Sequence, residues 1–107
     1  AIETVTNYKK YRHGEAVAVG MLYATRVAID MRLADNTVFE RQFSLIKRLG
    51  LPLHTGLKPD EIVKTLYADK KVIAGRLRFI LPTKIGEVII SDQVTEEILY
   101  RTLSKPF

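Results

Sequence analysis

Residues 13–31 have the sequence HGEAVAVGMLYATRVAIDM, and this stretch decides the fold. No charged residue lies between 16 and 25. The apolar residues cover most of a helix surface, because Val17, Val19 and Leu22 cannot share one face. A helix that is apolar nearly all round is buried on most sides. We therefore expect a central helix against which the rest of the chain packs.

Two more helices follow from capping signals. Residues 34–36 offer an N-cap for a helix whose apolar residues recur at helical spacing from Val38 to Leu49. Gly50 stands where a left-handed residue ends such a helix. Residues 58–61 begin the next helix, with proline in its first turn and acids at the positive end of the dipole.

The character of the chain then changes. Arg76–Leu81, bounded by Gly75 and Pro82, and Val88–Ile90 are typical of two short strands joined by a glycine-containing link. A last helix is expected to begin near Thr95 and to end by Ser104. The predicted class is mainly α, with one small β-hairpin.

Composition limits the possible functions. The chain has 107 residues, enough for one domain over 1–107, and a net charge of +5, which favours an anionic partner. It has no cysteine, which excludes a disulfide scaffold. No apolar stretch reaches the roughly 18 residues needed to span a bilayer, and no secretory signal is present.

His13 is the first candidate for chemistry. A helix N-terminus disfavours the charged imidazolium, and a neutral imidazole can ligate a metal. A catalytic zinc site takes about three protein ligands, and the other histidine, His54, has no second ligand near it in sequence. Further ligands would therefore lie outside this chain, and a capping or packing role for His13 stays open. Glu15 is either a base or carboxylate ligand, or an acid that complements the helix dipole.

Asp69-Lys70-Lys71 is the second candidate. The two lysine ammonium groups can bind phosphate or carboxylate as point charges. Alternatively, the segment is a solvated basic turn. Arg76 and Arg78 alternate on the expected strand, so they share a face that adds to an anion site or keeps the hairpin soluble.

Nucleic-acid binding is an alternative of a different class. Basic residues interleave with tyrosines over residues 8–12, which is typical of a stacking and phosphate-tracking surface. No groove-reading module accompanies them, so we regard nucleic acid as an unlikely partner.

Six motifs occur in order along nearly the whole chain: Ala1-Ile2-Glu3, HGEAVAVGM at 13–21, Gly50-Leu51-Pro52, Asp69-Lys70-Lys71, GRLRFILP at 75–82 and Ile85-Gly86. Together they resemble the 3-dehydroquinate synthase family of sugar-phosphate cyclases. The resemblance implies an N-terminal NAD-binding domain, a mainly helical C-terminal domain and an active site between them. This chain then corresponds to an incomplete C-terminal domain, with the NAD-binding domain absent.

The resemblance also implies an activity. The family converts 3-deoxy-D-arabino-heptulosonate 7-phosphate, a phosphorylated keto acid, to 3-dehydroquinate and phosphate in the shikimate pathway of aromatic amino acid biosynthesis. It uses NAD and a divalent metal, zinc or cobalt. His13 matches one of the metal ligands, and Lys70 or Lys71 matches a substrate-binding lysine. Other cyclases, of the 2-deoxy-scyllo-inosose or valiolone synthase type, are the alternative within this class.

Further expectations follow from the same resemblance. The enzyme is expected to be cytoplasmic and homo-oligomeric, with no membrane partner. The chain alone should neither turn over substrate nor bind NAD. It should expose an apolar patch where the other domain would pack, and we expect this patch to cause self-association.

Overall fold

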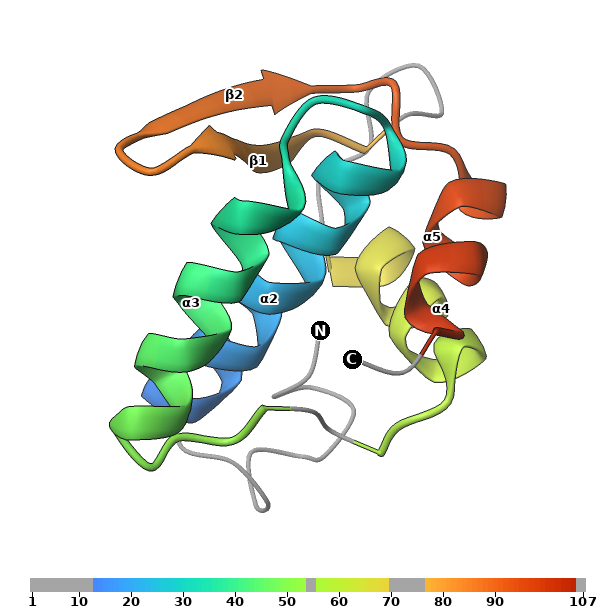
Figure 1. Ribbon diagram of the computed structural model, residues 1–107. Helices are drawn as coiled ribbons and strands as arrows, with labels where there is room; N and C mark the ends of the chain where they lie inside the picture. The colour runs from blue at the N-terminus through green and yellow to red at the C-terminus, as the bar shows by residue number, and fades with distance from the viewer. Residues whose placement is uncertain (1–12, 54–55, 70–76, 106–107) are drawn as a thin grey trace.

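The computed structural model describes residues 13–53, 56–69 and 77–105, which form four helices and a two-stranded antiparallel sheet (Figure 1). In chain order the elements are α2 (His13–Asp30), α3 (Asn36–Arg48), α4 (Pro59–Asp69), β1 (Phe79–Lys84), β2 (Glu87–Ser91) and α5 (Glu96–Leu103). α3 lies alongside α2, the hairpin crosses their upper end, and α4 and α5 pack together on the other side (Figure 1). The predicted class, mainly α with one small hairpin, is confirmed.

α2 is the central helix, as its sequence predicts, and it contacts α3, α5 and β1. In its second half, Val27 and Ala28 lie in a buried cluster with Val63 of α4, Leu81 of β1 and Leu99 of α5. The C-terminal half of α2 therefore shares one buried cluster with α4, β1 and α5.

A second cluster joins α2 to α3. Ala18 and Leu22 pack against Phe39 and Ile46 of α3, and Leu22 is fully buried. Of the apolar residues that predict α3 from the sequence, Phe39, Phe43 and Ile46 belong to this cluster, whereas Leu49 is 63% exposed.

The expectation that α2 is buried on most sides fails along one face of its first half. Val17 is 44% exposed and Met21 is 46% exposed, and they follow His13 at intervals of four residues, so the three share one helix face. Further along, the same face is covered, since Ala28 is fully buried. The apolar content of the sequence does not reveal this difference, because it counts Val17 and Met21 as core.

Both α2 and α3 end in the same hydrogen-bonded arrangement. Arg32 adopts a left-handed φ of 61°, and the Leu33 N–H donates to the Ala28 carbonyl at 2.8 Å. Gly50 has a φ of 73°, and its N–H donates to the Lys47 carbonyl at 3.1 Å. The prediction of a left-handed Gly50 is confirmed, whereas the arginine in the same role after α2 carries no comparable sequence signal.

The predicted helix starts are also confirmed. Asp35 is the N-cap of α3, although its side chain makes no capping hydrogen bond. Pro59 is the first residue of α4. Thr95 caps α5, and its hydroxyl accepts a hydrogen bond from the Ile98 N–H at 3.2 Å.

The first strand of the hairpin lies further toward the C-terminus than the predicted range 76–81. β1 does not stop at Pro82 but continues to Lys84, and Pro82 pairs with Val88. A proline is tolerated there because each strand of a two-stranded sheet has one open edge, which needs no N–H for the ladder. The register becomes irregular between Pro82 and Lys84. The strand also begins later than predicted, so Arg78 precedes it and does not lie within it.

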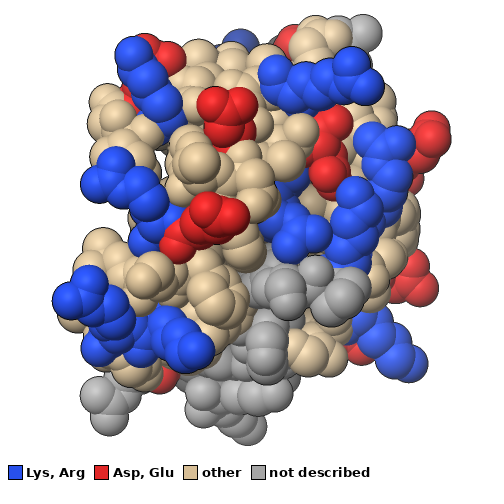
Figure 2. Space-filling model, viewed as in Figure 1, with Lys and Arg blue, Asp and Glu red and all other residues tan. Residues whose placement is uncertain are grey.

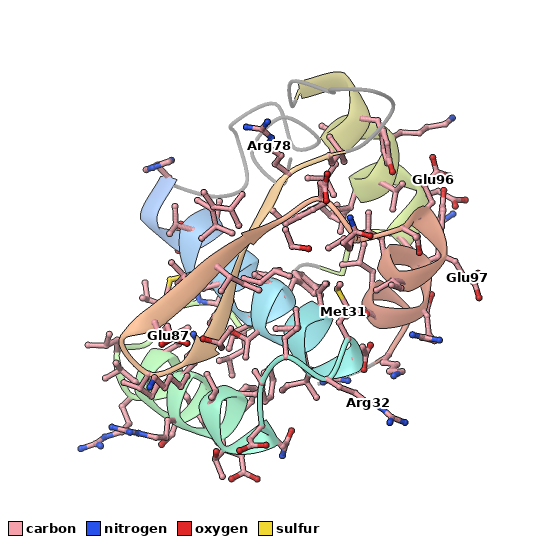
Figure 3. The ribbon with its side chains drawn as sticks, turned by 90° about the horizontal axis from the view of Figure 1, so that it is seen from above. Met31, Arg32, Arg78, Glu87, Glu96 and Glu97 are labelled. Atoms are coloured by element: carbon pink, nitrogen blue, oxygen red, sulfur yellow. The ribbon has the colours of Figure 1, made fainter. Side chains whose placement is uncertain are left out.

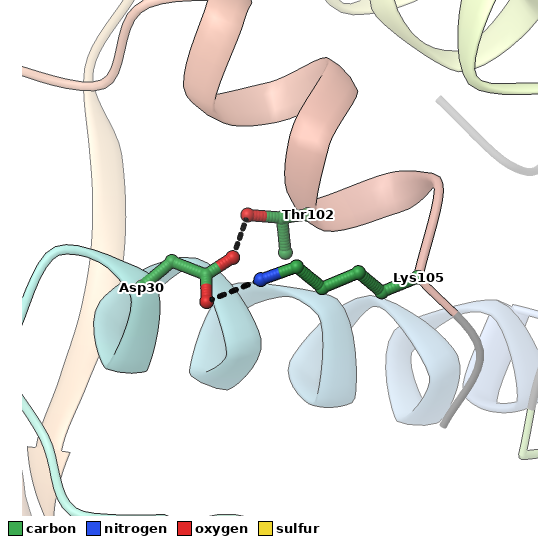
Figure 4. A network of polar contacts seen from close by, with 3 residues as sticks. All are labelled: Asp30, Thr102 and Lys105. Atoms are coloured by element: carbon green, nitrogen blue, oxygen red, sulfur yellow. Dashed lines mark hydrogen bonds and ion pairs between the residues drawn. The ribbon is translucent and has the colours of Figure 1, made fainter.

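A polar network fixes α5 to α2 across the chain (Figure 4). One Asp30 carboxylate oxygen accepts a hydrogen bond from the Thr102 hydroxyl at 2.6 Å, and the other accepts one from the Lys105 ammonium at 3.1 Å. Partial burial raises the pKa of Asp30, but the hydrogen bonds from Thr102 and Lys105 and the positive charge of Lys105 outweigh it and hold that pKa below its ordinary value. The network therefore stabilises the ionised carboxylate.

Candidate functional site

The site begins at the N-terminus of α2. His13 is the first residue of the helix and its side chain is exposed. Gly14 is also exposed, and a Cβ atom built on it would meet no atom within 4 Å. The imidazole is therefore presented at a helix end that is open to a partner or ligand.

We call the surface formed by His13, Gly14, Val17 and Met21 the open face of α2. It combines one imidazole side chain with two exposed apolar side chains. An apolar partner that covers Val17 and Met21 would also remove water from around the imidazole, and low polarity strengthens the coordination of a metal by neutral ligands. The arrangement suits a metal ligand at the edge of an interface.

Glu15 does not belong to the open face. It is half-buried in the first turn of α2, and residues two apart on a helix do not face each other. His13 and Glu15 therefore point to different sides of the helix. This position fits the interpretation of Glu15 as an acid that complements the helix dipole better than a shared ligand site.

A complete metal site needs several ligands that lie close together. Among residues 13–53, 56–69 and 77–105, no group of three or more His, Cys, Asp or Glu side chains comes together to hold a metal. His13 has the right chemistry for zinc or cobalt, but these residues supply one ligand where a catalytic site takes about three. The residues present fit a shared site and not one built within this part of the chain.

The predicted substrate lysines, Lys70 and Lys71, lie outside the described residues. The structure gives the position of the helix before them: α4 ends at Asp69, and Leu66 and Tyr67 pack against the buried cluster around α2. Burial raises the pKa of the Tyr67 hydroxyl, and the negative charge of Glu96 raises it further. The last turns of α4 are thus held against the core directly before the two lysines.

Of the other predicted basic residues, Arg78 is the one that the structure describes. Arg78 is exposed at the end of β1 away from the hairpin turn, where Figure 3 shows its side chain far from Glu87. Arg76, His54 and the basic segment at residues 8–12 lie outside the described residues. On the face drawn in Figure 2, basic and acidic side chains are interspersed.

Sequence reasoning missed the open face of α2, although two signals for it were present. Gly14 and Gly20 interrupt an otherwise bulky helix, and Val17 and Met21 repeat at four-residue spacing from His13. A Cβ atom at Gly20 would likewise meet nothing within 4 Å. Small residues beside an exposed apolar row are typical of a helix face that another element approaches.

Comparisons with known proteins all find similarity to 3-dehydroquinate synthases. The family model described as "3-dehydroquinate synthase C-terminal" matches residues 1–72. The 3-dehydroquinate synthase of Rippkaea orientalis is 48% identical over 101 residues, which are 92% of this chain and 28% of that protein. The 3-dehydroquinate synthase of a Picosynechococcus species is 44% identical over 97% of this chain and 29% of that protein. That of a Nostoc species is 41% identical over 98% of this chain and 30% of that protein. The chain thus spans less than a third of the length of these relatives.

Among the helices that the structure describes, none combines the length and the apolar character of a membrane-spanning helix.

Proposed function

Because this chain belongs to the 3-dehydroquinate synthase family, as part of its C-terminal domain, we propose that it forms one side of the active site of such an enzyme. The complete protein would convert 3-deoxy-D-arabino-heptulosonate 7-phosphate to 3-dehydroquinate and phosphate. The observation that carries this proposal is the open face of α2, where an exposed imidazole stands beside exposed apolar side chains.

His13 is proposed to be one ligand of a divalent metal, zinc or cobalt. The remaining ligands would come from parts of the enzyme beyond the described residues, among which no group of three or more possible ligands occurs. When bound, such a metal supplies Lewis acidity to a substrate hydroxyl or carbonyl. The part that this chain plays is to hold the imidazole at a fixed helix end and to offer an apolar rim that excludes water.

Lys70 or Lys71 is proposed to bind the substrate, preferably its phosphate. Both follow a helix whose last turns pack on the core, so the backbone that leads to them has a firm base. An ammonium group binds phosphate as a point charge and needs no fixed fork geometry. In this proposal NAD is held by an N-terminal domain, and the enzyme is cytoplasmic and homo-oligomeric.

The relatives reported above bear the name 3-dehydroquinate synthase. Their names support this member of the sugar-phosphate cyclases over the 2-deoxy-scyllo-inosose and valiolone synthases. They also favour an enzyme over a nucleic-acid-binding module.

The experiment that tests the metal assignment uses the full-length protein that carries this chain. His13→Ala should lower the metal retained after dialysis at least tenfold, measured by mass spectrometry of the elements, and should lower formation of 3-dehydroquinate in parallel. His54→Ala is the matched control, because the chain has only these two histidines. Unchanged metal content in the His13 variant would rule out ligation by this residue.

A further inference from the structure

The contact between α2 and α3 contains one polar pair in an otherwise apolar row. Four residues of α2, at intervals of three and four, lie along the face that meets α3 (Figure 1): Ala18, Leu22, Thr25 and Ile29. Thr25 is the polar member of this row and is fully buried. Its hydroxyl donates a hydrogen bond to the side-chain oxygen of Gln42, which lies on α3. A directional bond therefore occurs within an apolar contact.

The Thr25 hydroxyl also contacts the backbone of α2 itself. Its oxygen lies 3.0 Å from the carbonyl oxygen of Met21, one turn earlier in the helix. Threonine hydroxyls that bond the carbonyl four residues earlier often bend a helix. Met21 belongs to the open face of α2, so one hydroxyl joins the backbone of that face to Gln42 of α3. The pair therefore acts on the part of α2 that leads to His13.

Among the described helices, α3 is the one that supports the first half of α2. Val27, in the second half, shares a buried cluster with α4, β1 and α5, whereas Leu22 packs against α3. Apolar contacts are non-directional, so this packing by itself tolerates a small rotation or sliding of α2 along α3. A hydrogen bond does not, because it weakens steeply when donor and acceptor leave the favourable distance and angle. The bond between Thr25 and Gln42 is therefore suited to fix the register, by which we mean the position of α2 along α3 and its rotation about its own axis.

Stability alone gives little reason for a polar pair at this place. Replacing both partners of a buried hydrogen bond by apolar groups of the same shape is often nearly neutral or even stabilising. Buried polar residues between packed helices have a better attested use, which is to specify the register at some cost in stability. The position of Thr25 and Gln42, within the contact that supports the first half of α2, fits this use.

We propose that Thr25 and Gln42 are positioning residues, which fix the register of α2 on α3 and thereby hold the His13 imidazole where it binds the metal. This inference rests on the proposed function, because it takes His13 as a metal ligand. Thr25 does not touch the imidazole, since the 12 residues between their positions correspond to about 18 Å along the helix. Loss of a group that orients a metal ligand typically lowers metal affinity 10–100-fold. For a pair that acts from this distance we expect the lower end of that range, about tenfold.

The test uses the full-length protein that carries this chain, loaded with Co²⁺. Thr25→Val combined with Gln42→Met replaces the polar pair by an apolar pair of similar shape, so this double variant should unfold at the wild-type temperature or above it. Its dissociation constant for Co²⁺, measured by competition with a chelator, should nevertheless rise about tenfold. At saturating metal, kcat should fall at least fivefold while KM changes less than twofold. The visible absorption of the bound Co²⁺ should change as well, because it reports the geometry of the ligands.

Two single variants serve as controls. Thr25→Ser keeps the hydroxyl, so its affinity for Co²⁺ should stay within twofold of the wild-type value. Thr65→Val removes a hydroxyl that bonds the carbonyl four residues earlier, that of Glu61, at 2.8 Å within α4. This variant loses the same kind of bond within a helix, at a place remote from the contact of α2 with α3, and should change the affinity less than twofold.

A double variant that keeps the wild-type stability, Co²⁺ affinity and kcat would overturn the inference. So would a double variant whose affinity falls only together with its unfolding temperature, because the pair would then be an ordinary stabilising contact. His13→Ala separates this result from the proposed function. If His13→Ala leaves the affinity for Co²⁺ unchanged, the metal assignment fails and the positioning role fails with it. If His13→Ala weakens Co²⁺ binding and the double variant does not, the positioning role alone is refuted.

Discussion

Removal of the Thr102 hydroxyl should loosen α5 from α2. The hydroxyl donates at 2.6 Å to an ionised carboxylate, and the Thr102 side chain is fully buried. Hydrogen bonds to charged groups contribute about 1.5–3 kcal/mol. Because valine has nearly the same shape, Thr102→Val should cost about 2 kcal/mol through the lost bond alone.

Hydrogen exchange of the α5 backbone amides measures this cost locally, in whatever length of chain is used. A loss of about 2 kcal/mol corresponds to about thirtyfold faster exchange, since each 1.36 kcal/mol is a factor of ten. Lys105→Met, which removes a partly exposed ion pair with Asp30, should accelerate exchange about fivefold at most. Thr65→Val is the matched control, because the Thr65 hydroxyl donates only to the Glu61 carbonyl within an exposed turn of α4.

The effect should also depend on pH. The pKa of Asp30 is lowered in the folded protein, so its contribution is complete above the ordinary carboxyl value of about 3.9 and is lost as the pH falls through the lower folded value. The difference between wild type and Thr102→Val should therefore shrink below about pH 3.9. A change of less than threefold at pH 7, or an acceleration that stays constant from pH 7 to pH 2.5, would refute this reasoning.

Three further predictions follow from local geometry. Gly20→Ala should stabilise the protein by about 0.5–1 kcal/mol, because a Cβ atom there meets no atom in the interior of a helix. Gly50→Ala should destabilise it by about 1 kcal/mol, because Gly50 has a φ of 73°. In thermal unfolding the two variants should shift the melting temperature in opposite directions, and shifts in the same direction would contradict the prediction. Thr95→Ala should cost about 1 kcal/mol in urea unfolding, and Asp35→Ala distinctly less, because only Thr95 makes a side-chain capping bond; the reverse order would be a failure. Leu22→Ala should cost about 3–5 kcal/mol, because the side chain is fully buried between α2 and α3, and a loss below about 1 kcal/mol would show that this packing is not rigid.

Helix boundaries were predictable because the chain marks them with local chemistry. Gly50, Pro59 and Thr95 each satisfy or spare backbone groups at a helix end, and each stands where the sequence places it. Pro82 gave a false boundary. Proline interrupts a strand only where its missing N–H is needed, and in a two-stranded sheet that depends on which edge it faces.

The site was predictable only in part. The motif around His13 predicted a helix start and a metal ligand. The structure confirms the helix start and shows an exposed side chain, whereas metal ligation remains a prediction. The exposure of Val17 and Met21 could not be predicted from the sequence. An apolar residue type is compatible with packing in the core of this chain and with packing against another surface. The roles of Lys70 and Lys71 remain predictions, since both lie outside the described residues.

The two halves of α2 also have a mechanical relation. Val27, held in the core, and His13 are separated by 14 residues of one continuous helix, which is an arm of about 21 Å at 1.5 Å per residue. Because Ala18 and Leu22 pack against α3, α3 would have to move with α2; a tilt of the helix of about 3° at its core end would then shift the N-terminal tip by about 1 Å. Displacements of that size in a reacting group can reduce rates by about 100-fold. Conservative substitutions around Val27 would therefore displace His13 at the opposite end of α2, without any change in the residues that surround the imidazole.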